Sequence, residues 1–161
     1  MLRSLKVLLL LLLTATFLWG CGAATQEQEI LCNELTLMLP PGFVDFSEDC
    51  AEEGLAFNYA DVDMGICGSF EEKTYLTQYI PDITAEKYAQ LFLQTNGMDA
   101  AVETKDGIPC FTYTAADYTY LCGVFASREN FWVIQAYCAS GDYAAKADAM
   151  WNCITSVTVN E

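Results

Sequence analysis

Alternating hydrophobic and polar positions divide much of the chain into short segments that predict β-strands. Leu35, Leu37 and Leu39 fall on one side of such a segment, and Pro40-Pro41-Gly42 ends it. A period of two residues is typical of a strand with one buried face. Strands or extended segments are predicted in this way at residues 35–39, 43–46, 55–59, 64–70, 101–104 and 108–115. Asp106-Gly107, between the last two, is a strong hairpin signal.

Two later segments, 118–126 and 131–138, are apolar on both sides. One side of the first carries Tyr118, Tyr120, Cys122 and Val124, and the other carries Leu121, Gly123 and Phe125. A sheet that meets water on one face would show apolar and polar residues in alternation. We therefore expect these two strands, joined by the polar turn 127–130, to be central and covered on both faces.

A different spacing predicts two amphipathic helices. Thr84 is a suitable N-cap for the first, whose apolar residues recur at helical spacing before Gly97 stops it. The second, about 142–155, carries one apolar stripe. With one helix for each sheet face, the sequence predicts an α+β fold: an antiparallel sheet of about six strands flanked by helices on both faces, as a three-layer α/β/α sandwich.

This order of elements resembles the PsbP-like fold, which an extrinsic subunit of photosystem II shares with the Ran-binding Mog-type proteins. The resemblance is one of pattern and covers most of residues 33–160. It includes a first strand that ends in LPPGF, the mid-chain helix TAEKYAQLFLQTNG, three more strands, and a closing helix that runs into SVTV. It implies a non-catalytic binding or assembly role by analogy of fold.

The first twenty residues differ in kind from the rest. Arg3 and Lys6 are followed by thirteen mainly apolar residues, 7–19. A basic start and a short apolar core are typical of a secretory signal. A transmembrane helix would need about 20 apolar residues. Residues 1–20 are therefore interpreted as a signal peptide.

Leu18-Trp19-Gly20-Cys21 resembles the lipobox of bacterial lipoprotein precursors. The resemblance implies cleavage between Gly20 and Cys21 and attachment of lipid to the Cys21 thiol. Trp19 departs from the pattern, in which a smaller residue is usual. Stable anchoring needs more than one acyl chain, and lipoprotein processing supplies them. The alternative is an ordinary secretory signal and a secreted protein.

The sequence thus divides into a signal peptide (1–20), a lipid-anchored tether (21–32) and a single globular domain (33–161). We expect the domain on the extracytoplasmic face of the cell membrane. Removal of Arg3 and Lys6 takes the formal net charge from −15 to −17. That charge repels phosphate backbones, which excludes nucleic acid as an expected partner. Solubility is the main explanation for the acidity, and a cation or a basic partner stays open.

The residues for common catalytic chemistries are missing. The chain has no histidine, which removes Ser-His and Cys-His dyads and imidazole metal sites. It has no glycine-rich phosphate loop. We expect no cofactor, and we favour a non-enzymatic binding or assembly domain at the cell envelope whose partner is an envelope protein or a small ligand. The alternatives are a hydrolase or thiol-redox protein that uses carboxylates or a reactive cysteine, and a structural spacer.

Seven cysteines follow Cys21, and none forms a C-x-x-C pair. A three-residue turn at 115–117 would set Cys110 opposite Cys122, so we hypothesise a disulfide there; the alternative is that most of the cysteines are buried free thiols. No metal site is predicted. The run Asp61 to Gly65 hints at a calcium loop, but its glycine is misplaced, and a hairpin is favoured. The acidic cluster 48–53 is interpreted as a solvated loop.

Overall fold

The computed structural model describes residues 26–50 and 54–160. The predicted signal peptide, Gly20 and Cys21 lie outside these residues, so those interpretations stay predictions. The described strands are β1 (Gln28–Cys32), β2 (Leu35–Leu39), β3 (Val44–Asp45), β4 (Phe57–Ala60), β5 (Met64–Glu72), β6 (Glu103–Lys105), β7 (Ile108–Ala115), β8 (Tyr118–Ala126), β9 (Asn130–Ala139) and β10 (Thr158–Val159). The described helices are α2 (Ser47–Cys50), α3 (Lys73–Leu76), α4 (Ala85–Thr95), the 3-10 turn η2 (Ser140–Asp142) and α5 (Tyr143–Thr155).

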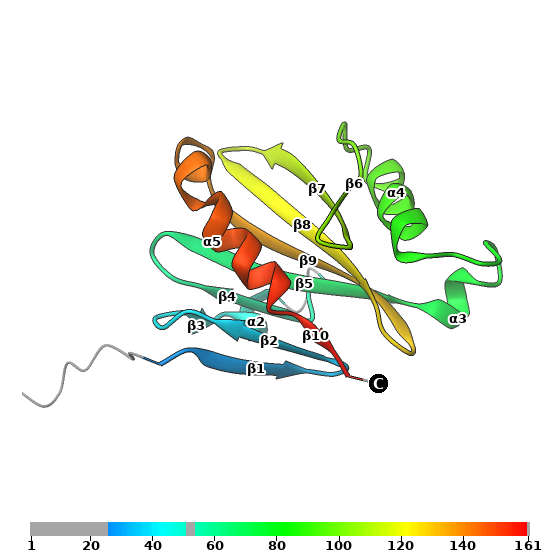
Figure 1. Ribbon diagram of the computed structural model, residues 1–161, viewed down its shortest axis with the longest axis horizontal. Helices are drawn as coiled ribbons and strands as arrows, with labels where there is room; N and C mark the ends of the chain where they lie inside the picture. Colours follow the sequence, from blue (N-terminus) through cyan, green and yellow to red (C-terminus); the bar gives the residue numbers. More distant parts are fainter. Residues whose placement is uncertain (1–25, 51–53, 161) are drawn as a thin grey trace, which may run out of the picture.

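The strands form two antiparallel sheets in place of the single sheet that was predicted. The larger has seven strands in the order β3-β4-β5-β9-β8-β7-β6, and the smaller has three in the order β1-β2-β10 (Figure 1). The predicted first strand, β2, is thus the centre of a separate sheet. Its side chains Leu35, Leu37 and Leu39 are fully buried, because this small sheet packs them into the core of the larger one.

The predicted tether is shorter than expected. Gln28–Cys32 belongs to β1, which pairs with β2 from Gln28 opposite Leu39 to Cys32 opposite Leu35. β1 is an edge strand whose outer side meets solvent, and this position explains why the segment contains polar residues. The described chain therefore enters the fold at Gln28 and not after residue 32.

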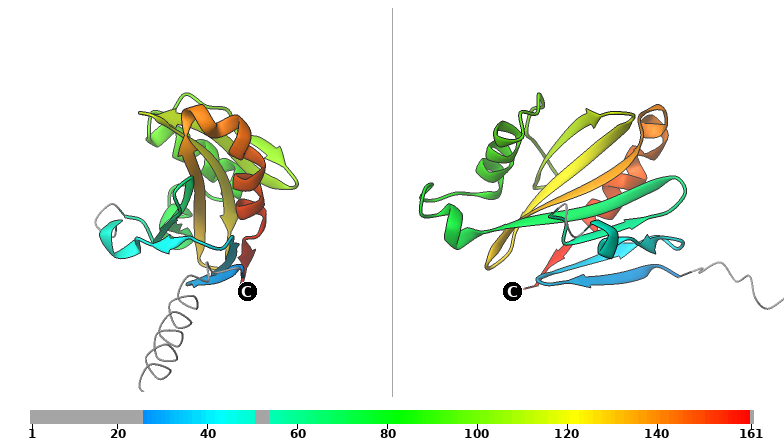
Figure 2. Two further views of the ribbon diagram at one scale, coloured as in Figure 1. Left: turned by 90° about the vertical axis from the view of Figure 1, so that its left-hand side faces the viewer. Right: turned by 180° about the vertical axis from the view of Figure 1, so that it is seen from behind.

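One face of the seven-stranded sheet packs against α5 and the small sheet. Met150 and Ile154 of α5 are fully buried there, with Trp132 of β9. Figure 2 shows α5 lying along this side. A Cβ atom on Gly123 would lie 2.5 Å from Cγ2 of Ile154. A glycine in β8 therefore lets α5 approach the sheet closely.

The opposite face of the sheet packs against α4. Tyr88, Ala89 and Leu93 of this helix are buried, and the ring of Tyr88 stacks on that of Phe131 with centroids 5.1 Å apart. The sheet residues beneath α4 are Phe111, Cys122, Val124, Phe131 and Val133. The predicted N-cap is confirmed, since Thr84 Oγ1 accepts a hydrogen bond from the Lys87 backbone N–H.

The β8–β9 turn is fixed to the small sheet by Glu34, which lies between β1 and β2. The Glu34 carboxylate accepts hydrogen bonds from Asn130 Nδ2 at 2.8 Å, from the Glu129 N–H at 3.1 Å and from the Ser127 hydroxyl. Partial burial raises the pKa of Glu34, but these hydrogen bonds together outweigh it and hold that pKa below its usual range. The enclosed Trp132 Nε1 is close enough to help lower this pKa, yet it is outside hydrogen-bonding geometry with any described acceptor.

The fold is thus a mixed α+β arrangement of antiparallel sheets with few helices. The predicted α/β/α sandwich is not confirmed in the form expected, because the small sheet shares one face with α5 and α4 packs over only part of the other. Within residues 26–50 and 54–160, no helix has both the length and the apolarity to cross a bilayer.

Candidate functional site

The sheet face under α4 changes character along its length. Beyond the residues that α4 packs on, the same sides of β7, β8 and β9 carry Tyr113, Tyr118, Tyr120 and Tyr137, which we call the tyrosine face. Tyr113 lies opposite Tyr120, and Tyr120 lies opposite Tyr137. Tyr118 is 46% exposed, and the other three are half-buried. These strands were predicted to be covered on both faces, and at this end that prediction is wrong.

The four rings form a continuous row across three strands. Tyr113 and Tyr120 stack with centroids 4.7 Å apart and planes 5° apart. Tyr137 follows at 5.6 Å from Tyr120, and Tyr118 meets Tyr137 nearly edge-on at 6.1 Å. Aromatic pairs of this kind contribute about 0.5–1.5 kcal/mol beyond their buried area. The rings therefore pack on one another, and Tyr113 and Tyr120 also pack against the edge of the core under α4.

Gly65 in β5 makes room for the last ring of the row. A Cβ atom on Gly65 would lie 2.2 Å from Cζ of Tyr137, far inside van der Waals contact. The Tyr137 ring thus extends over β5, and its hydroxyl donates to Oδ1 of Asn58 in β4 at 3.1 Å. This position needs a glycine because any side chain would displace the Tyr137 ring.

A buried amide lies beside the row. Gln135 is 8% exposed, and its Oε1 accepts hydrogen bonds from the Tyr113 hydroxyl at 2.7 Å and, at 3.8 Å, from the Cys122 thiol. Its Nε2 has no hydrogen-bond partner within the described residues. Burial raises the pKa of Tyr113 and that of Tyr120. Both hydroxyls therefore stay protonated at neutral pH.

A pocket of about 300 Å³ adjoins the end of the tyrosine face. Its walls include the rings of Tyr118 and Tyr137 and three carboxylates, Asp61, Asp63 and Asp142. Asp61 Oδ1 accepts from the backbone N–H groups of Asp63 and Met64 at 2.7 and 2.8 Å. Asp63 pairs with Lys146 at 2.7 Å. The pocket combines aromatic surface with a net negative charge, which suits a cationic group.

The aspartates at this pocket belong to the segment that hinted at a calcium loop. The structure places Asp61 to Asp63 in the turn between β4 and β5, so the hairpin interpretation is confirmed. No group of three or more histidine, cysteine or acidic side chains placed to hold a metal ion occurs in the described part of the chain. In the acidic cluster, Glu48 and Asp49 fall in α2 in place of the expected loop, and 51–53 lie outside the described residues.

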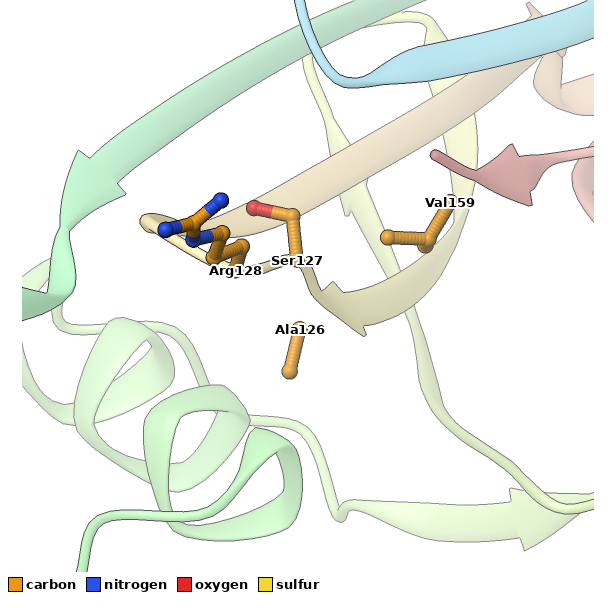
Figure 3. Close-up of a pocket in the computed structure, with 4 residues that line it drawn as sticks. All are labelled: Ala126, Ser127, Arg128 and Val159. Atoms are coloured by element: carbon orange, nitrogen blue, oxygen red, sulfur yellow. The ribbon is translucent and has the colours of Figure 1, made fainter. Parts of the chain in front are cut away.

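A larger cavity, about 500 Å³, lies between the β8–β9 turn and β10. It is lined by Ala126, Ser127, Arg128 and Val159 (Figure 3). The Ser127 hydroxyl is already bonded to Glu34. In the view of Figure 3, Ser127 lies between Arg128 and Val159. None of the described residues that line this cavity is aromatic, and we interpret it as a gap between the two sheets.

The two cysteines of the hypothesised disulfide do not face each other. The β7–β8 turn has two residues and not three, so Cys110 lies opposite Gly123, and Cys122 lies opposite Phe111. Cys110 packs in the core under α5 and Cys122 in the core under α4. Both are free thiols in the structure. Burial raises the pKa values of the thiols of Cys32, Cys110, Cys122, Cys138 and Cys153.

Comparison with known proteins bears on the fold. No protein-family model matches the chain, and no curated protein sequence is significantly similar to it. Cyanobacterial PsbP (CyanoP) from Synechocystis sp. PCC 6803 has a similar solution structure, with a TM-score of 0.60 and 14% identity over 87% of this chain and 96% of that one. The fold is PsbP-like. A mutant of protein Mog1 is less similar, with a TM-score of 0.47 and 11% identity over 84% of this chain and 97% of that one.

The PsbP-like fold was predictable from the order of elements, but the tyrosine face was not identified from the sequence. A signal for it is present. On β8 the residue type along one side changes from Tyr118 and Tyr120 to Cys122 and Val124, and on β9 it changes from Tyr137 to Val133 and Phe131. Tyrosine has a polar tip on an apolar body, which suits a surface that is only partly buried.

Proposed function

We propose that this chain is a non-enzymatic binding domain, held outside the cytoplasm by lipid on Cys21, that engages a protein partner through the tyrosine face. The observation that carries the proposal is the row of four half-buried or exposed tyrosines on a sheet face where α4 ends. Tyrosine is enriched at protein interfaces because it combines apolar area with a hydroxyl that tolerates water. The rings also pack on one another in the absence of a partner, and such preorganisation lowers the entropic cost of binding.

The packing of the cysteines supports this proposal over a thiol-redox role. A reactive cysteine needs a lowered pKa and access to solvent. The five thiols named above have raised pKa values, and four of them are buried. The pocket acids do not support a hydrolase either, because Asp61 is occupied by two backbone N–H groups and Asp63 by Lys146.

The position of the tyrosine face is compatible with a lipid anchor. The start of β1, the β4–β5 turn, the β7–β8 turn and the start of α5 all lie toward the same end of the molecule (Figures 1 and 2). Six residues, 22–27, separate Cys21 from β1 and span at most about 20 Å when extended. A domain tethered in this way would present its tyrosine face near the bilayer, within reach of the outer portion of a membrane protein.

Site-specific photocrosslinking tests the binding role. Benzoylphenylalanine in place of Tyr118 keeps an aromatic ring at the tyrosine face, and the same substitution at Tyr79 provides a control. Tyr79 is also exposed, at 69%, but follows α3 near the other end of the strands (Figure 1). We expect irradiation of intact membranes to crosslink one discrete protein from position 118 and none from position 79. Equal crosslinking from both positions would contradict the proposal.

The lipid anchor needs its own test. Labelling of growing cells with a fatty-acid analogue should modify the wild-type chain and leave the Cys21→Ala variant unlabelled. A wild-type chain that stays unlabelled and remains in the aqueous phase of a detergent extraction would favour the secreted alternative. The binding role at the tyrosine face does not depend on this result.

A further inference from the structure

We infer that the partner presents a basic polypeptide segment, which lies along the tyrosine face and places an arginine or lysine side chain in the 300 Å³ pocket at its end. The inference rests on the proposed function and names the chemistry of its partner. Three features of the face carry it: the aromatic walls of the pocket, the charge of its carboxylates, and the amide of Gln135.

The pocket matches a long cationic side chain in both shape and charge. Tyr118 and Tyr137 provide aromatic surface in its lining, on which an aliphatic stem or a guanidinium can pack. Asp63 is neutralised by Lys146, but Asp61 and Asp142 have no ion pair within the described residues. Lys146 also interacts electrostatically with Asp61 and Asp142, but one ammonium group facing three carboxylates leaves the pocket with a net negative charge. An incoming cation would therefore meet negative charge beside two aromatic rings, and these two attractions reinforce each other.

Gln135 adds a hydrogen-bond donor to this face. The residue is 8% exposed and its side chain points to the tyrosine side, because Oε1 is bonded to the Tyr113 hydroxyl. The Nε2 group donates to no acceptor in the described protein. It is not enclosed, because the one enclosed side-chain nitrogen or oxygen without a partner in the described residues is Trp132 Nε1. Nε2 therefore offers its N–H donors at the surface of the tyrosine face, where a partner can supply an acceptor.

The combination favours a polypeptide over a small amine. An ammonium or guanidinium ion has donors but no acceptor, so it can satisfy the pocket and not Gln135. A peptide chain carries a carbonyl acceptor at every residue and a cation on some of them. Gln135 lies two residues along β9 from Tyr137, so one extended segment a few residues long can reach both the amide and the pocket.

Two labelled peptides serve as matched probes. One alternates arginine and glycine, and the other alternates citrulline and glycine. Citrulline keeps the shape of arginine and removes its charge. Binding is measured by fluorescence anisotropy with the full-length chain in a neutral detergent at 150 mM salt, chosen to screen long-range attraction. We expect the arginine peptide to bind at least about tenfold more tightly than the citrulline peptide.

Variants locate the site. Asp142→Asn removes a pocket charge that makes no side-chain hydrogen bond to cap α5, and Gln135→Met removes the amide. Each should weaken arginine-peptide binding by about tenfold. Asp99→Asn is the matched control, because it removes the same charge from an exposed loop and should leave binding unchanged. An equal effect of Asp99→Asn and Asp142→Asn would show non-specific attraction and overturn the inference.

The remaining outcomes separate this inference from the proposed function. If position 118 crosslinks a partner but the arginine peptide is insensitive to Asp142→Asn, the binding face stands and its basic partner is wrong. If position 118 crosslinks nothing and no peptide binds, both fail. Binding to phosphatidylethanolamine vesicles that Asp142→Asn abolishes, without peptide binding, would assign the pocket to lipid headgroups and also overturn the inference.

Discussion

Two halves of one sheet face, built from the same three strands, differ in what covers them. The half under α4 carries phenylalanine, valine and cysteine, and Val124, Phe131 and Val133 are at most 2% exposed. The other half carries the tyrosine face. Strand geometry and register are shared, so the difference reflects only the environment above the sheet. The change from phenylalanine, valine and cysteine to tyrosine marks the point on the sheet face where packing against α4 ends.

The two halves should also differ in what they contribute. Burial of apolar area is the main stabilising term in folding, so the covered half should dominate stability. The tyrosine half leaves apolar area partly open to water, and that area becomes favourable only when a partner covers it. Substitutions in the first half should therefore change the free energy of unfolding, and substitutions in the second should change binding.

Phe131→Ala should have the largest effect on stability. The Phe131 ring is 2% exposed, stacks with Tyr88 and lies 4.9 Å from Lys73 Nζ. Truncation of a buried phenylalanine costs about 3–5 kcal/mol. Urea denaturation of the purified full-length chain measures this loss. A loss below about 1 kcal/mol would mean that α4 does not cover this half as described.

Gly65→Ala and Gly123→Ala form a matched pair on opposite faces. Each new methyl group would overlap a neighbouring side chain, Tyr137 at 2.2 Å or Ile154 at 2.5 Å. Each should destabilise the fold by about 1–3 kcal/mol. Only Gly65→Ala should also weaken peptide binding and reduce crosslinking from position 118, because it displaces the ring that walls the pocket. Equal loss of binding in both variants would indicate an effect of global stability alone.

Glu34→Gln tests how the end of the sheet near α3 is fixed. The folded-state pKa of Glu34 is lowered, so its contribution is present above the unfolded value of about 4.3 and is lost as pH falls through the folded value. We expect wild type to exceed the variant by about 1 kcal/mol at pH 7. In urea denaturation at a series of pH values, that difference should shrink below about pH 4. A difference independent of pH would contradict the assigned hydrogen bonds.

Tyr118→Ala should have the smallest effect on stability and a large effect on binding. Tyr118 is 46% exposed and contacts Tyr137 only edge-on, so the free energy of unfolding should change by no more than about 0.5 kcal/mol. The arginine peptide should bind several-fold more weakly because the pocket loses an aromatic wall. Tyr79→Ala, at an exposed tyrosine outside the face, should change neither quantity.

The sequence pattern predicted local elements well because strands and helices follow from nearest neighbours. The bounds expected for β7 and β8 match the structure at both ends, and Thr84 caps α4. The small sheet was missed because its pairing joins β10 to β2 across most of the chain. A two-residue strand such as Thr158–Val159 has no pattern of its own to show that contact.

The register of β7 and β8 was predicted wrongly for a local reason. Ala116 adopts a φ of +51°, a conformation that is uncommon for residues other than glycine. This permits a two-residue turn, which places Cys122 opposite Phe111 and no longer opposite Cys110. A shift of one residue transfers every side chain to the other face. The hypothesised disulfide assumed the register of a three-residue turn. The tyrosine face becomes evident only in the register that the structure shows.

Tyrosine nitration in native membranes tests the central claim most directly. Tetranitromethane modifies exposed tyrosines, and mass spectrometry can compare each position in intact membranes and in the purified full-length chain. A partner on the tyrosine face should reduce nitration of Tyr118 several-fold in membranes, while Tyr75 and Tyr79, exposed at 56% and 69%, react equally in both. Equal nitration of Tyr118 in both samples would contradict the claim that a partner covers this face.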